Sequence, residues 1–211
     1  MKTILCFGDS NTWGWNPVAG QRYGRDQRWP GVMRNALGEE YLVVEEGLNG
    51  RTTVWDDPVE GDKNGSAHLP MLLDTHRPLD LVIIMLGTND LKARFSVPAC
   101  DIAAGAASLV DIVLGSVAGP AGTAPKVLLC APPPLGKLTN FAEMLTGGKQ
   151  KSQRFGAAYR AVADVKGVDF LDTARHIRSS DIDGVHWEAD THRKLGEVMA
   201  ETVGGVLEYR E

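Results

Sequence analysis

The sequence predicts an α/β protein in which helices cover both faces of a central parallel β-sheet. Five short runs are apolar without polar alternation, which is typical of parallel strands buried on both faces. Stretches with a helical spacing of apolar residues separate these runs from one another. Because strands and helices alternate along the chain, we expect a three-layer α/β/α sandwich with a five-stranded parallel sheet and right-handed crossovers.

The expected elements follow one another in a regular β-α order. The five predicted strands are Thr3–Phe7, Leu42–Val44 with its flanks, Leu81–Leu86, Val127–Cys130 and Val168–Leu171. The five predicted helices are Trp29–Leu37, Ser66–His76, Ile102–Val117, Gln150–Val165 and Ala189–Leu207. We expect the strands in the flavodoxin-like order, in which ligands bind beyond the carboxyl ends of the strands. The segments that leave the strands are therefore where functional residues are expected.

Three long segments between the predicted elements have no clear periodicity. They are Asn11–Arg28, Val54–Gly65 and Pro132–Gly148. Segments of this length in a folded domain are more often functional loops or oligomer contacts than simple spacers.

Length and composition limit the possible functions. The 211 residues suffice for one well-buried core, so we expect a single domain over residues 1–211. With 43% hydrophobic and 23% charged residues, the composition is that of an ordinary folded protein. The net charge of -5 provides no basic surface for phosphate groups, which disfavours nucleic acids and anionic membranes as partners. Small molecules are the expected ligands.

The cysteines and the start of the chain indicate a cytoplasmic protein. Cys6, Cys100 and Cys130 are odd in number and lack C-x-x-C spacing, which fits a reducing compartment, and we interpret all three as core or packing residues. The first predicted strand begins at Thr3 and leaves no room for a signal peptide. The least polar long stretch, residues 102–119, contains too many polar residues for a membrane span.

A serine follows the first strand in the stretch FGDSNTWGW, residues 7–15. A lone serine at such a place most often caps the next helix. Gly8 permits a tight backbone there, so Ser10 would present both its hydroxyl and its N–H at the ligand-binding edge of the sheet. A hydroxyl becomes a nucleophile when a base takes its proton and a third group orients that base. Ser10 is therefore either a helix cap or a nucleophile.

The stretch DIDGVHW, residues 181–187, provides a candidate base and acid. Asp183 stands three residues before His186, with Gly184 between them to allow a tight turn. This spacing lets the carboxylate reach the Nδ1–H of the histidine and leaves Nε2 for the serine. Asp181 is the reserve candidate for the acid. The other reading of D-x-x-H is a surface turn.

Three groups could stabilise a carbonyl oxygen that becomes negative. Asn89 follows the most apolar strand in the stretch LGTND, and Gly50 offers a backbone N–H with no side chain in the way. The N–H of Ser10 is the third donor. Taken singly, Asn89 and Gly50 are also ordinary turn formers.

Four blocks in this order resemble the SGNH (GDSL-type) hydrolases. They are GDS at 8–10, the glycine of NGRTT at 49–53, GTND at 87–90 and DGVH at 183–186. The longer stretches FGDSNTWGW, EEGLNGRTT, DLVIIMLGTNDLKA and the three prolines at 132–134 resemble the arylesterase and acyltransferase branch of that family. The set covers nearly the whole chain.

This resemblance implies an SGNH hydrolase fold and a set of roles. Ser10 would be the nucleophile, His186 the base and Asp183 the acid, with Ser10 N–H, Gly50 N–H and the Asn89 side chain in the oxyanion hole. The implied activity is an acetylesterase or arylesterase that acts on short acyl esters, including carbohydrate acetates, through an acyl-serine, with water or an alcohol as the acceptor. The resemblance also implies a homo-oligomer, and relatives of this branch form octamers.

The sequence departs from the family at two places. Asn11 stands where the name-giving pattern has leucine, which affects the shape and polarity of the acyl pocket. The loop 134–148 carries Phe141 as its only ring, so the substrate range can differ from that of aromatic-rich relatives.

Residues next to the candidate groups are the predicted substrate-binding residues. Among three tryptophans near these groups, at least one of Trp15 and Trp187 is expected to line an apolar pocket rather than only to fill the core. Lys92 either shapes the entrance of the pocket or is a solvated charge. The full predicted set is Asn11, Trp15, Thr88, Lys92, Val185 and Trp187.

Other readings of the sequence are weaker. A flavodoxin-like module could hold a phosphorylated ligand with Ser10, Asn11 and Thr12, but this would leave Asp183, His186 and Asn89 without a role. No G-x-S-x-G motif is present, which argues against an α/β-hydrolase elbow. The remaining histidines lack metal-ligand spacing and are expected on helix or loop surfaces: His68, His76, His176 and His192. We therefore expect neither a metal nor a cofactor.

Overall fold

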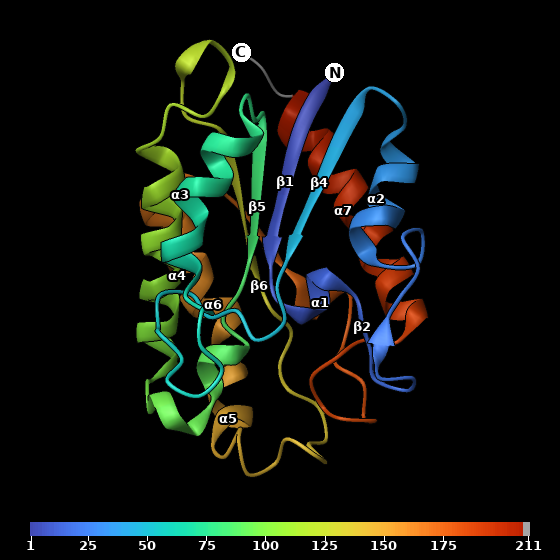
Figure 1. The fold of residues 1–211 in the computed structure, drawn as a ribbon, viewed down its shortest axis with the longest axis vertical. Coiled ribbons are helices and arrows are strands. Elements are labelled where there is room, and N and C mark those ends of the chain that lie inside the picture. Colours follow the sequence, from blue (N-terminus) through green and yellow to red (C-terminus); the bar gives the residue numbers. More distant parts are fainter. Residues whose placement is uncertain (209–211) are drawn as a thin grey trace.

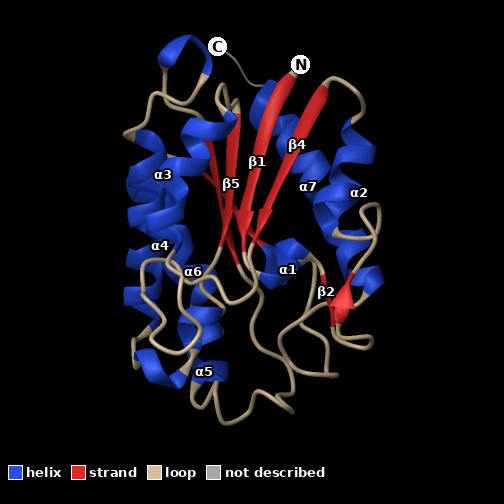
Figure 2. Cartoon of the chain, viewed as in Figure 1, coloured by secondary structure: helices blue, strands red, loops and turns tan. Residues whose placement is uncertain are grey.

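A five-stranded parallel β-sheet forms the centre of the molecule (Figures 1 and 2). This computed structural model describes residues 1–208. The strand order across the sheet is β4-β1-β5-β6-β7, and every pairing in it is parallel. The strands are β1 (Lys2–Gly8), β4 (Tyr41–Gly47), β5 (Leu81–Met85), β6 (Lys126–Ala131) and β7 (Asp169–Asp172). β4, the second strand of this sheet along the chain, therefore lies at the edge beside β1, and the later strands follow on the other side of β1. This arrangement confirms the flavodoxin-like order.

Helices cover both faces of the sheet and confirm the three-layer architecture (Figure 1). One face carries α2 (Trp29–Leu37) and α7 (Ala189–Glu208). The other carries α3 (Gly65–His76), α4 (Ala99–Leu114) and α6 (Phe155–Lys166). The strand arrows point toward the end of the molecule where the short helices α1 (Ser10–Trp13) and α5 (Gly148–Ser152) lie. That end carries the carboxyl ends of the strands.

Short elements complete the chain around this end and between the long helices. A two-stranded antiparallel hairpin joins β2 (Trp15–Asn16) to β3 (Gln21–Arg22). The four 3₁₀ segments are η1 (Asn89–Leu91), η2 (Ala93–Phe95), η3 (Pro120–Gly122) and η4 (Thr173–Arg175).

Successive residues of the central strands enter two different cores. In β1, Ile4 and Cys6 pack with α2 and α7, whereas Leu5 and Phe7 pack with α3, α4 and α6. Because side chains alternate across a strand, a strand that is apolar at every position must be covered on both faces. The uninterrupted apolar runs of the sequence therefore follow directly from the layered fold.

Two predicted helices differ from those observed. The helix predicted at 102–117 is α4, which begins at Ala99 after the extended Pro98 and ends before Gly115. The helix predicted at 150–165 is divided into α5 and α6. At the division the Arg154 N–H donates to the Lys151 carbonyl, three residues back, which tightens the end of α5.

The cysteines are unpaired, and one of them lies on the surface. Cys6 and Cys130 are buried in the sheet, but the prediction that Cys100 is a packing residue is wrong because it is exposed. In α4 the buried face runs through Ala99, Ile102 and Ala103, so position 100 points to solvent. No helix among the described residues has both the length and the apolar character that a bilayer span requires.

Candidate active site

Ser10 begins the short helix α1 directly after β1, and it does not cap that helix. Asp9 is the N-cap, because its side chain accepts a hydrogen bond from the Asn11 N–H at 2.9 Å. Gly8 is required at the strand end, since a Cβ there would collide with the side chain of Thr12. The helix therefore turns back against the end of β1 and presents the Ser10 hydroxyl at the edge of the sheet.

His186 lies between Ser10 and Asp183 in a continuous chain of hydrogen bonds. Its Nε2 is 2.9 Å from the Ser10 Oγ, and its Nδ1 is 2.6 Å from Asp183 Oδ2. The Asp183 contact fixes the proton on Nδ1, which leaves Nε2 able to accept the serine proton. All three side chains are buried to more than nine-tenths. The geometry is that of a base oriented by an acid and directed at a hydroxyl.

The turn at 183–186 is held by its own backbone. Asp183 Oδ1 accepts the N–H groups of Val185 and His186, each at 2.8 Å. Burial raises the pKa of the Asp183 carboxyl, but the hydrogen bonds from His186 and Val185 outweigh burial and hold this pKa below its usual value. Gly184 has a φ of +80°, and a Cβ there would collide with the backbone of Lys137. Asp183 therefore stays ionised beside His186 at neutral pH.

Asp181, the reserve candidate for the acid, is not next to His186, so that alternative is wrong. It is exposed, and its Oδ1 accepts the N–H of Lys137 at 3.0 Å. Asp181 lies two residues before Asp183, and its carboxylate points to the loop that follows β6.

The three predicted oxyanion donors border the same cavity as Ser10 and His186. One N–H of the Asn89 side chain donates to the Arg51 carbonyl at 3.1 Å, which fixes the amide and leaves its second N–H for a ligand. Within residues 1–208, neither the Ser10 N–H nor the Gly50 N–H donates a hydrogen bond. Gly50 has a φ of +82°, which favours glycine at this place.

The cavity has an apolar wall and a polar wall, and its volume is about 190 Å³. Of the six predicted substrate-binding residues, Trp15, Thr88, Lys92 and Val185 line it. The Trp15 ring centroid is 5.7 Å from that of His186, and the Phe141 ring centroid is 5.8 Å from it. The remaining lining residues, which the substrate-binding prediction lacks, are Asn49, Glu60, Phe141, Met144 and Leu145.

Asn11 and Trp187 do not line the cavity, and their assignment as substrate-binding residues is wrong. Asn11 is 4% exposed, and its Nδ2 donates to the Val185 carbonyl at 3.2 Å. Trp187 is 1% exposed and packs in the core beside α7. Each is next in sequence to a cavity residue, but the backbone directs neighbouring side chains to different sides. Asn11 therefore ties α1 to the 183–186 turn instead of contacting a ligand.

His192 is also placed differently from its prediction as a surface residue. It is fully buried on α7, where its Nδ1 accepts the Trp29 N–H at 3.3 Å. Burial lowers its pKa to about 3, so it is neutral. It lies on the same helical face as Leu195 and Met199, which explains its burial. Among the described residues, no group of three or more His, Cys, Asp or Glu side chains could hold a metal ion.

The phosphate-binding alternative does not fit the segment after β1. Thr12 is fully buried, and the Asn11 side chain is already bonded to Val185. Only Ser10 of the three proposed phosphate contacts borders the cavity.

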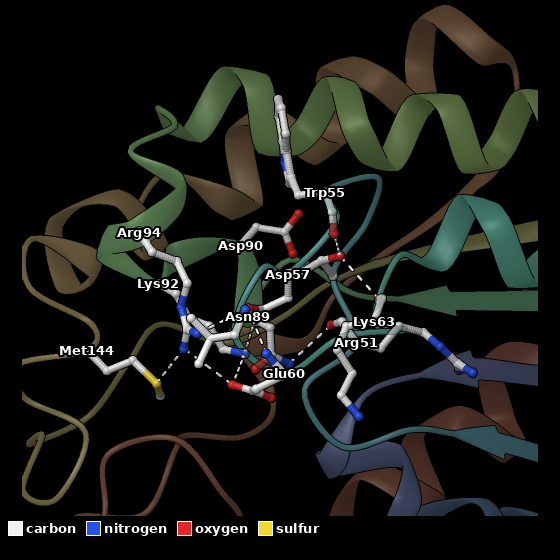
Figure 3. Close-up of polar contacts among 12 residues, drawn as sticks. Arg51, Trp55, Asp57, Glu60, Lys63, Asn89, Asp90, Lys92, Arg94 and Met144 are labelled. Carbon is white, nitrogen blue, oxygen red and sulfur yellow. Dashed lines mark hydrogen bonds and ion pairs between the residues drawn. The ribbon is translucent and has the colours of Figure 1, made fainter.

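Four charged side chains, which we call the ionic wall, contact one another beside the cavity (Figure 3), and two of them, Glu60 and Lys92, line it. The ionic wall consists of Asp57 and Glu60 from the loop before α3, and Lys92 and Arg94 from the segment after β5. Lys92 Nζ lies 3.1 Å from Asp57 Oδ2 and 2.5 Å from Glu60 Oε1. Lys92 is 1% exposed, so of its two predicted roles the solvated charge is wrong. The sequence indicated only that 54–65 is a functional loop.

Two more buried carboxyl groups, which the sequence analysis missed, lie behind the cavity. Asp90 accepts hydrogen bonds from the N–H and the hydroxyl of Thr53, and Asp9 caps α1. Burial raises the pKa of each to about 6. Asp90 joins the segment after β5 to the segment after β4, whereas Asp9 holds the first turn of α1 at the end of β1.

Comparison with known proteins shows which family and which solved structures this chain is similar to. The family model described as the GDSL-like Lipase/Acylhydrolase family matches residues 6–194. A carbohydrate acetylesterase from Sinorhizobium meliloti has 45% sequence identity and a TM-score of 0.95, with 98% of this chain and 100% of that chain covered. The native aryl esterase of M. smegmatis has 46% identity and a TM-score of 0.94, with the same coverage.

A curated relative matches over a shorter stretch. It is an arylesterase from Vibrio mimicus, 36% identical over 92 residues, which are 42% of this chain and 38% of that protein. The match thus spans well under half the length of this curated relative.

Proposed function

This chain belongs to the GDSL-like lipase/acylhydrolase family, and we propose that it is a serine esterase acting on acetates and other short-chain acyl esters. The observation that carries the proposal is the hydrogen-bonded chain from Ser10 through His186 to Asp183 at the mouth of the cavity. Aryl acetates and carbohydrate acetates are the proposed substrate classes, because the similar solved proteins are an aryl esterase and a carbohydrate acetylesterase.

In the first half of the proposed reaction, the enzyme is acylated. The Ser10 Oγ attacks the ester carbonyl carbon while its proton moves to His186 Nε2, and Asp183 stabilises the imidazolium that forms. The carbonyl oxygen becomes negative and accepts hydrogen bonds from the proposed donors Ser10 N–H, Gly50 N–H and Asn89 Nδ2. The tetrahedral intermediate then collapses, His186 gives its proton to the leaving alcohol oxygen, and an acyl-serine remains.

In the second half, water or an alcohol releases the acyl group. His186 takes a proton from the acceptor as its oxygen attacks the acyl-serine, and that proton returns to Ser10 when the bond breaks. Trp15, Phe141 and Val185 give one wall of the cavity an apolar surface. Such a surface disfavours bound water and supports acyl transfer to alcohols alongside hydrolysis.

The size of the cavity supports a short acyl group. A volume of about 190 Å³ is small compared with typical drug-sized ligand pockets. A cavity of this volume has room for acetyl and similarly short acyl groups rather than for long acyl chains.

A homo-oligomer, with the octamer as its proposed form, is the expected state of the protein. Val18 and Val59 are 73% and 74% exposed; Val18 lies in the turn of the β2–β3 hairpin, which begins at the cavity residue Trp15, and Val59 precedes the cavity residue Glu60. Exposed apolar side chains beside a site are typical of surfaces that another subunit covers. The unpaired cysteines support the cytoplasm as its place.

Labelling with a serine-directed fluorophosphonate tests the proposed nucleophile. We expect one adduct per chain, located by mass spectrometry on Ser10, together with loss of p-nitrophenyl acetate hydrolysis. Ser10→Ala should abolish labelling, whereas Ser66→Ala, which removes a hydroxyl bonded to Asn64, should retain it. An adduct on a different residue, or no adduct, would contradict the proposal.

A further inference from the structure

Glu60 is the member of the ionic wall that faces the cavity with an unused oxygen. Its side chain is 34% exposed and lines the cavity beside Gly50 and Lys92. The Oε1 oxygen lies 2.5 Å from Lys92 Nζ and 3.3 Å from an Arg94 nitrogen. Among residues 1–208, no group donates a hydrogen bond to Oε2.

The other three side chains of the ionic wall, Asp57, Lys92 and Arg94, form their contacts with groups of the protein itself. The Asp57 side chain is fully buried and accepts the N–H groups of Val59 and Glu60 as well as both cations. The Lys92 side chain is 1% exposed and lies between the two carboxylates. Arg94 also contacts the Met144 sulfur at 3.3 Å, as Figure 3 shows. Glu60 is therefore held in one position by the buried Lys92 and the partly exposed Arg94, and its second oxygen is available to a ligand.

The available oxygen lies next to the proposed oxyanion hole. A Cβ at position 50 would collide with Glu60 Oε2, so this oxygen packs directly on Gly50, one of the proposed oxyanion donors. A carboxylate oxygen can only accept hydrogen bonds. An acetyl group has no donor to give it, so the donor must come from the alcohol part of the ester.

We propose that Glu60 selects esters whose alcohol carries a free hydroxyl near the ester oxygen, as in partly acetylated polyols and sugars, over esters of simple or anionic alcohols. This inference rests on the proposed esterase function and adds a specificity residue to it. A hydroxyl that donates to an ionised carboxylate makes a stronger hydrogen bond than a neutral pair does. An anionic alcohol would instead meet the unpaired charge of Oε2 at close range.

Three esters of equal chain length test the proposal through ratios of kcat/KM. Glycerol 1-acetate offers hydroxyls, propyl acetate offers none, and 3-acetoxypropanoate carries a negative charge. In Glu60→Gln the amide oxygen stays with Lys92 and Arg94, and an NH₂ group replaces the charged acceptor. We expect the glycerol acetate to propyl acetate ratio to fall about 10-fold. The 3-acetoxypropanoate to propyl acetate ratio should rise about fivefold.

Two further variants exclude a merely structural effect. Glu60→Ala should lower the glycerol acetate ratio at least as much as Glu60→Gln, because no polar group remains. Asp62→Asn removes a charge from an exposed position on the same loop that does not line the cavity, and should leave both ratios unchanged. Asn also tolerates the φ of +25° at this position.

The outcomes separate this inference from the esterase function itself. Ratios that stay unchanged in both Glu60 variants, or equal losses on all three esters, would overturn the selective role of Glu60 while leaving the esterase intact. Hydrolysis of p-nitrophenyl acetate but of none of the three esters would overturn only the role of Glu60. If the wild-type protein hydrolyses neither p-nitrophenyl acetate nor any of the three esters, the proposed function fails, and the selectivity of Glu60 fails with it.

Discussion

The 183–186 turn and the ionic wall border the same cavity, but they are built in opposite ways. In the turn, Asp183 is bonded to groups two and three residues away, two of them backbone N–H groups. In the ionic wall, side chains 32 to 37 residues apart in the sequence meet. The turn is thus a local unit set by its own residues, whereas the wall exists only after two loops have come together.

Because the turn is local and the ionic wall joins two distant loops, we expect changes in the two regions to have different effects. The local turn positions the proposed base, so changes in it should affect the reaction more than the stability of the fold. The ionic wall joins the loop before α3 to the segment after β5 and buries charge. Changes in it should therefore affect stability and selectivity before they affect the chemical step.

The largest effect is expected from Asp183→Asn in the turn. The amide cannot hold the Nδ1 proton of His186 as the carboxylate does, so the imidazole favours the wrong tautomer, and kcat for p-nitrophenyl acetate should fall about 10⁴-fold. Thermal unfolding should change little, since the hydrogen bonds to the amide oxygen can persist. Asp181→Asn is the matched control and should keep its activity. A small loss of kcat in Asp183→Asn would remove the acid from its proposed role.

Asn89→Ala should have the next largest effect. It removes the side-chain donor proposed for the oxyanion while Ser10 and His186 keep their contact, so kcat should fall about 10²-fold or more with little change in KM. Circular dichroism should show the native fold. Should kcat stay at the wild-type value, the oxyanion hole would have to be assigned to other groups.

Lys92→Met in the ionic wall should have the smallest effect on the chemical step and act on stability. It leaves the buried Asp57 carboxylate with fewer partners, so we expect the free energy of unfolding to fall by about 3 kcal/mol in urea titrations. Lys166→Met breaks a surface pair with Asp111 and should cost less than about 1 kcal/mol. Equal losses in the two variants would show that burial adds nothing to the ion pairs of the ionic wall.

The same contrast explains which predictions from the sequence were confirmed. The strand order and the α/β/α layers were predicted from repeated local patterns, the family was predicted from the resemblance of four short motifs, and each is confirmed. Ser10, His186 and Asp183 could be identified because their segments follow strands whose carboxyl ends lie at the same edge of the sheet, and the structure brings them together. Their roles in the reaction stay predictions until they are measured.

The errors concern side-chain direction and long-range pairing. Trp187 and Asn11 are next in sequence to cavity residues but point away from the cavity, and His192 is polar yet lies on a buried helical face. A residue next in sequence to a cavity residue has its backbone near the cavity. The direction of its side chain, however, depends on backbone dihedrals that the tertiary packing fixes.

The sequence by itself determined the architecture through the periodicity of its strands and helices, and the residues of the proposed catalytic turn through their short spacing. It indicated the family through four short motifs that resemble those of the SGNH hydrolases. All of these are local properties of the chain. Only the tertiary structure decided that Lys92 is a buried cation between Asp57 and Glu60, and that Glu60 directs an unused carboxylate oxygen into the cavity. Charges in separate loops carry no local signal of their partners. Their pairing is selected by the folded chain, since an unpaired charge at such a buried position would be strongly destabilising.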